Sequence, residues 1–164
     1  MKKIHLYPIV ITFLALFIAC ESDDKVVDEV LGTYTSGAVL RTLEKSGSFD
    51  MFRVERVFAV TLEEQDEQNG ELIERVDITV DFVDNNKTGP SGDATNLGVA
   101  FATLAATDFT LGERGLPTAD FSYTMQEALT ALGVTLDQVL PGDRIAINLE
   151  LFFTDGRSFK ADDA

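Results

Sequence analysis

The side chains that most often carry catalysis are scarce in this sequence. The chain has one cysteine, Cys20, and one histidine, His5, and both lie within the first 20 residues. Nucleophilic catalysis of the Ser-His-Asp or Cys-His kind needs a base that titrates near neutral pH, and zinc sites need imidazole or thiolate ligands. Beyond residue 20 the sequence offers neither side chain. We therefore predict that the protein is not an enzyme.

Carboxylates are the one abundant reactive group. A pair of them could hydrolyse a glycoside, but most fall in expected loops or at outward strand positions, where a solvated charge is the usual state. Oxygen ligands also suit Ca²⁺. The candidate calcium ligands are Asp81, Asp84, Asn86 and Asp93. Their spacing does not match an EF-hand loop, and turn chemistry explains the same residues, so we expect no cofactor and keep Ca²⁺ as the ion to test.

The acidic excess of the chain limits its partners. It has 28 acidic and 13 basic residues and a formal net charge of −15. Removal of residues 1–19 would take away Lys2 and Lys3 and no acidic residue, which makes the net charge −17. Nucleic acids and anionic lipid surfaces need a basic face. We therefore expect no nucleic-acid partner, and solubility at a crowded cell surface is the simplest role of this charge.

The N-terminal stretch has the layout of a secretory signal peptide. Lys2 and Lys3 precede an apolar run at residues 4–19, which is shorter than the roughly 20 apolar residues of a membrane-spanning helix. The small residue Ala19, next to Cys20, fits cleavage before the cysteine. The alternative is an uncleaved N-terminal anchor.

The stretch Phe17-Ile18-Ala19-Cys20 resembles the lipobox of bacterial lipoproteins, with Phe17 where leucine is usual. The resemblance implies that residues 1–19 are a lipoprotein signal peptide and that Cys20 becomes a lipidated N-terminus that binds the membrane. The acidic stretch Cys20-Glu21-Ser22-Asp23-Asp24-Lys25 resembles the export signal of surface-exposed lipoproteins of Bacteroidota. The alternative for that stretch is a solvated acidic tether.

The chain is also similar, in general terms, to small lipoproteins of Bacteroidota that accompany outer-membrane nutrient-uptake complexes. The likeness lies in the leader, in the acidic stretch after Cys20 and in the sandwich-type strands from Gly142-Asp143-Arg144-Ile145 through Asp155-Gly156-Arg157-Ser158-Phe159. It implies a surface-exposed outer-membrane lipoprotein with a transport or surface complex as partner, acting by protein–protein contact. It carries over no functional residue. The alternative is a Ca²⁺-dependent adhesion or glycan-binding module, although the lack of Trp argues against glycan binding.

After an acidic lipidated tether at residues 20–37, we expect one domain at residues 38–164. Its hydrophobic period is mostly two, which is typical of half-buried strands. The expected strands are residues 39–43, 52–63, 72–84, 99–107, 119–124, 144–154 and 158–160. The alanines in 99–107 also fit a helix. In residues 72–84, the side chains expected to face inward are Val76, Ile78, Val80 and Phe82.

Two local signals join these strands. Asn69-Gly70 predicts a tight turn, and hence an antiparallel hairpin between residues 52–63 and 72–84. Thr124-Met125-Gln126-Glu127 fits a capping box that begins a short helix, which Gly133 ends.

About seven strands and one short helical crossover predict an all-β fold, an immunoglobulin-like or fibronectin-like antiparallel β-sandwich. The rival is a single antiparallel sheet packed on the helix. Phe152 faces outward on its strand and is the candidate partner-binding residue, unless the helix at residues 125–132 covers that face. The final strand is a short edge strand, or the sequence stops before its natural end.

Overall fold

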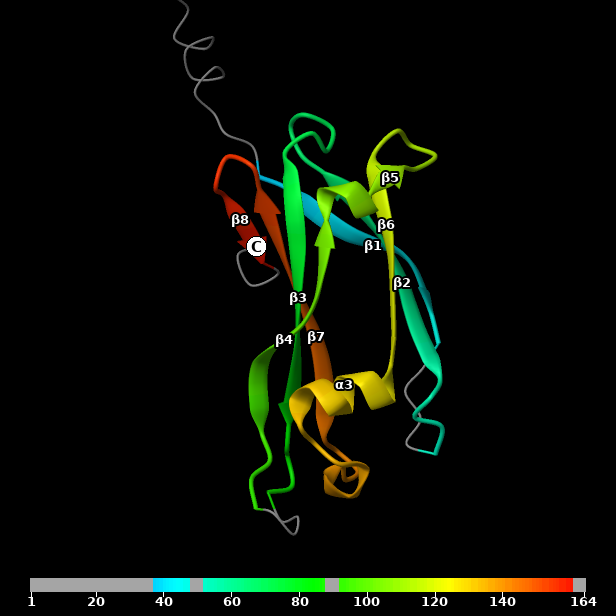
Figure 1. Cartoon of the computed structure of the whole chain (residues 1–164), viewed down its shortest axis with the longest axis vertical. Helices are drawn as coiled ribbons and strands as arrows, with labels where there is room; N and C mark the ends of the chain where they lie inside the picture. The colour runs from blue at the N-terminus through cyan, green and yellow to red at the C-terminus, as the bar shows by residue number, and fades with distance from the viewer. Residues whose placement is uncertain (1–36, 48–51, 88–91, 161–164) are drawn as a thin grey trace, which may run out of the picture. The chain divides into compact units, whose positions relative to one another are not determined.

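The computed structural model describes residues 37–47, 52–87 and 92–160 (Figure 1). The chain divides after Thr35, and all described residues belong to the second unit, Ser36–Ala164. The predicted signal peptide, Cys20 and nearly all of the tether therefore lie outside the described residues. Within the described ranges, no helix is long and apolar enough to cross a membrane.

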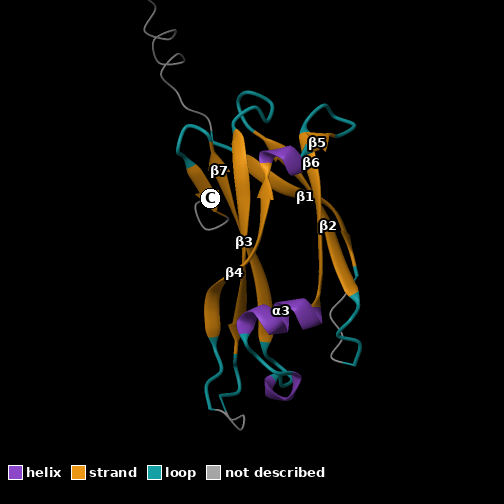
Figure 2. Ribbon diagram, in the orientation of Figure 1, coloured by secondary structure: helices purple, strands orange, loops and turns teal. Residues whose placement is uncertain are grey.

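The described strands form two antiparallel four-stranded sheets, which confirms the predicted all-β sandwich (Figure 2). The strand orders are β1-β2-β6-β5 and β4-β3-β7-β8. This is the order of the ABED and CFG sheets of an immunoglobulin constant domain, with β4 added beside the strand that corresponds to C. The strands are β1 Val39–Ser46, β2 Val57–Gln65, β3 Ile73–Val83, β4 Asn96–Ala105, β5 Thr110–Leu111, β6 Pro117–Thr124, β7 Arg144–Phe153 and β8 Ser158–Lys160.

The core lies between the two sheets, where the period-two pattern places it. The predicted inward side chains of β3 are all at most 1% exposed: Val76, Ile78, Val80 and Phe82. Aromatic rings fill the middle of the core, because Phe101 meets both Phe121 and Tyr123 edge-to-face at an interplanar angle of 86°. Such edge-to-face contacts add to the burial energy of the rings.

Helix α3, Met125–Leu132, forms the predicted crossover from β6 to β7 and closes one end of the sandwich (Figure 2). The capping box is confirmed, since the Glu127 amide donates to the Thr124 hydroxyl and the Glu127 carboxylate accepts from the Thr124 amide. Gly133 ends the helix in the left-handed conformation at φ 66°. The buried face of α3 packs on Val80 and Phe82 of β3, inside the sandwich.

The predicted hairpin at Asn69-Gly70 is wrong. β2 pairs with β1 and β6, while β3 pairs with β4 and β7, so the chain crosses from one sheet to the other at this turn. Both turn residues have the positive φ expected of Asn-Gly, 57° and 93°. The turn chemistry was therefore predicted, but not the strands it joins. Asp66 holds the loop between the sheets by accepting backbone N–H groups from Gln68, Gly70 and Leu72.

Candidate functional site

Within the described ranges, one edge of β7 is paired along only part of its length. β3 pairs with β7 along its length, from Ile73 opposite Phe153 to Val83 opposite Arg144. On the other edge β8 pairs only with Glu150, Leu151 and Phe152. Among the described residues, no strand pairs with that edge at residues 144–149. Since a strand rises about 3.3 Å per residue, roughly 20 Å of this backbone edge has no paired strand in the described part of the chain.

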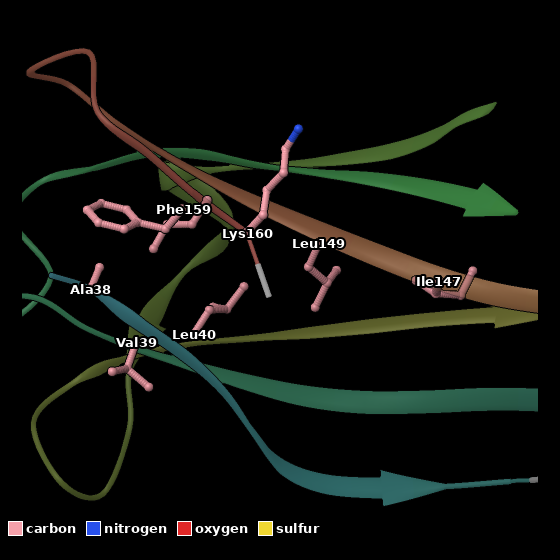
Figure 3. A pocket seen from close by; sticks show the side chains of 8 residues that line it. Ala38, Val39, Leu40, Ile147, Leu149, Phe159 and Lys160 are labelled. Atoms are coloured by element: carbon pink, nitrogen blue, oxygen red, sulfur yellow. The ribbon is translucent and has the colours of Figure 1, made fainter. Parts of the chain in front are cut away.

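An apolar hollow lies beside this open edge, between β1 and the β7–β8 pair (Figure 3). It has a volume of about 330 Å³ and is lined by Ala38, Val39, Leu40, Ile147, Leu149, Leu151, Phe159 and Lys160. A second hollow of about 320 Å³ is also lined by Ile147 and Leu149 of β7. On its other side it is lined by residues of the facing sheet, among them Lys45, Phe58 and Phe121. We call the two hollows together the trough. Leu40 and Leu149 point toward each other across it (Figure 3).

The trough differs in charge from the rest of the acidic chain. Among the described residues, the charged side chains that line it are Lys45 and Lys160, and none is a carboxylate. Lys160 forms an ion pair with Glu150 at 3.0 Å, and Lys45 is exposed at the rim. An extended segment with apolar side chains on one face and acidic ones near the rim would match this lining.

The edge of β1 across the trough is a poorer receiver of another strand. Its pairing with β2 shifts register between Thr42 and Glu44, a bulge, and it carries Arg41, Glu44 and Lys45. Bulges and charges are the usual devices that keep an edge strand from pairing with another chain. β7 has no register shift over residues 144–149. Of the two edges that flank the trough, β7 at residues 144–149 is therefore the more regular.

The structure places Asp84, a predicted calcium ligand, in a different role. Its side chain is nearly buried, at 3% exposure. One carboxylate oxygen accepts from the amides of Asn86 (3.0 Å) and Lys87 (2.7 Å), and the other accepts from Ala94 (3.1 Å). These bonds, that from Lys87 first, lower the pKa of Asp84 below its ordinary value. The carboxylate fastens the loop that follows β3.

The other three predicted ligands point to separate partners. Asp81 accepts from the amide of Gly98 at 2.6 Å. Asn86 donates to Asp143 at 2.8 Å. Asp93 accepts from Thr95, which with Lys87 lowers its pKa to about 2. In the described part of the chain no group of three or more acidic, His or Cys side chains could hold a metal ion, and the calcium site stays a prediction.

Phe152 lies on the outer face of its sheet, as expected. Helix α3 does not cover it, because the helix packs inside the end of the sandwich. The ring is covered instead by the guanidinium of Arg75, 3.9 Å from the ring centroid. The guanidinium also donates hydrogen bonds to Asp77, and these contribute most to raising the pKa of Arg75 above its ordinary value. A partner at Phe152 would have to displace or include this cation.

Two features were missed by reasoning from sequence. The one feature of the sequence that pointed to the trough was the short final strand expected at residues 158–160, because a short strand can pair with only part of its neighbour. The second feature is Glu64, a fully buried carboxylate, which the sequence assigned to a loop. The alternation of Phe58, Val60 and Leu62 continues to Glu64 and could have revealed its inward position.

The fold and the trough together define an immunoglobulin-like β-sandwich with an open-edged apolar groove. Comparison with protein-family models, with curated proteins and with solved structures gives no match.

Proposed function

We propose that the protein is a non-enzymatic, lipid-anchored protein of the cell envelope, whose sandwich is a binding domain that acts by protein–protein contact at the outer membrane. The trough is the observation that carries the binding role. It sets apolar side chains, among them Leu40, Ile147 and Leu149, beside an open strand edge. Strand addition is a common mode of peptide recognition, since the backbone edge gives affinity and alternate side-chain pockets give specificity.

The occupant we propose is an extended segment of a partner protein, paired with β7 at residues 144–149. Its alternate side chains would enter the trough, and its acidic side chains would lie near Lys45. Burial of three or four apolar side chains contributes about 1.5–3 kcal/mol each before the costs of ordering are subtracted.

Photocrosslinking in the native envelope tests the trough. A photoreactive phenylalanine analogue replaces Lys45, at the exposed rim of the trough, and in a matched control it replaces Leu111, which is 76% exposed on β5. We expect a discrete adduct with one partner protein from position 45 and not from position 111. An Ile147→Lys change, which puts a charge into the trough, should abolish the adduct. An adduct with only a second copy of this chain would replace the proposed partner, and equal labelling from both positions would contradict the proposal.

The anchor is tested separately at Cys20, on which the lipobox resemblance rests. Wild-type protein should sediment with membranes and carry lipid on residue 20 by mass spectrometry. Cys20→Ala should lose both properties and leave the sandwich folded. A native product in which Cys20 is internal and unmodified would overturn the anchor, and it would leave the trough experiment unaffected.

A further inference from the structure

Glu64 is a fully buried carboxylate near the end of β2. It lies on the inward face of β2, directly opposite Leu40 of β1, and is 0% exposed. Neither carboxylate oxygen has a hydrogen-bond partner among the described residues. Gly70 and Pro117 pack close to it: a Cβ added at Gly70 would lie 3.2 Å from a Glu64 oxygen and would overlap the Pro117 ring.

The charged groups around Glu64 do not neutralise it. Among the described residues, the charge that acts on Glu64 is that of Asp66, in the loop between the sheets, and it has the same sign. Two cations nearby interact with Glu63 instead, on the opposite face of β2. Arg41 donates to the Glu63 carboxylate, and the Arg114 guanidinium lies 3.8 Å from it. Burial first, and Asp66 second, raise the pKa of Glu64 to about 7.

We infer that Glu64 is a proton-controlled latch, neutral while the start of β1 is packed on β2 and ionised when that segment opens to water. The route to water is through β1, because β1 is the edge strand of its sheet and Leu40 lies opposite Glu64. Leu40 also lines the trough. A proton would therefore adjust the width of the trough as well, a consequence that rests on the proposed function, whereas the latch itself does not.

Amide hydrogen exchange in the full-length protein tests the latch. Protection at residues 39–42 is compared at pH 5 and pH 8 after correction for the intrinsic exchange rate. Between pH 4.5 and 7 each pH unit favours the ionised open form about tenfold. We expect protection of these amides to fall by several tens of fold, while amides of β3 change far less.

Two variants make the outcome decisive. Glu64→Gln removes the titration and should leave protection at residues 39–42 nearly constant with pH; Glu64→Met serves the same purpose if the glutamine variant folds poorly. Glu71→Gln, an exposed position in the following loop, should keep the wild-type response. Equal loss of protection in β1 and β3, or an unchanged pH response in Glu64→Gln, would overturn the inference. Neither result would bear on whether a partner occupies the trough.

Discussion

Glu64 and Asp84 are two buried carboxylates whose pKa values are shifted in opposite directions. Glu64 precedes the loop that leads into β3, and Asp84 follows the end of β3. Asp84 accepts three backbone N–H groups, and its pKa is lowered. Glu64 has no hydrogen-bond partner among the described residues, and its pKa is raised to about 7. The comparison teaches that burial alone does not fix the charge of a carboxylate; the donors around it do.

Glu63 supplies the third case, next to Glu64 in the chain. It is 1% exposed but lies on the other face of β2, where it is opposite Arg41 in the register and pairs with it. Adjacent residues on one strand thus meet different surroundings because their side chains point to opposite faces. Glu63 therefore has Arg41 beside it on the outer face, whereas the charge that acts on Glu64 on the inner face is the like charge of Asp66.

Replacement of Glu64 by leucine should have the largest effect on stability. Between pH 4.5 and 7 the unfolded chain releases this proton while the folded chain keeps it, so wild-type stability falls as pH rises through that window. The raised pKa of Glu64 lowers the free energy of unfolding by at most about 3 kcal/mol at pH 8 and by little at pH 5. Urea unfolding should show Glu64→Leu more stable than wild type mainly at pH 8. The exposed control Glu71→Leu should show no such pH-dependent gain, and a Glu64→Leu protein less stable at both pH values would contradict this account.

Loss of the cation at Glu63 should have a smaller effect of opposite sign. Arg41→Met keeps much of the packing of the side chain but leaves Glu63 with Arg114 at 3.8 Å as its remaining cation. Because Arg41 is itself about one-third exposed, we expect destabilisation of about 2 kcal/mol, less than for a fully buried pair. A double-mutant cycle with Glu63→Gln measures the coupling. Additive effects of the two changes would show that the pair contributes nothing.

The sequence predicted the features that depend on local pattern. The alternation in β3 identified its buried residues, and the Thr124–Glu127 capping box located the helix, because both are fixed by backbone geometry over a few residues. Asn69-Gly70 predicted its own backbone conformation for the same reason. Which strands it connects depends on how the two sheets pack, and no short stretch encodes that.

The candidate sites were harder to predict. The outer-face or loop position of Asp81 and Asp84 was readable, but whether their oxygens face a cation or the chain's own amides depends on the loop conformation. The trough lies where the described residues of β8 pair with only part of β7 and β1 lies across from it. That arrangement is a property of two edges far apart in sequence, so neither edge reveals it alone.

Asp84→Asn should have the smallest effect of the three and the opposite pH dependence to Glu64. A folded pKa below the ordinary value of 3.8 means that the contribution of Asp84 is present above that pH and is lost as pH falls through the folded pKa. An amide keeps one acceptor oxygen, so we expect the Tm to fall by only a few degrees at pH 7, and the gap from wild type to close in acid. Melting curves at pH 7 and pH 3 measure this, with Asp137→Asn, an exposed position, as control.

The same melting curves with added Ca²⁺ complete the comparison. If the Asp84 carboxylate only fastens its loop, Ca²⁺ leaves the Tm of wild type and of Asp84→Asn unchanged. A Ca²⁺-dependent rise in the wild-type Tm that Asp84→Asn abolishes would make Asp84 a metal ligand.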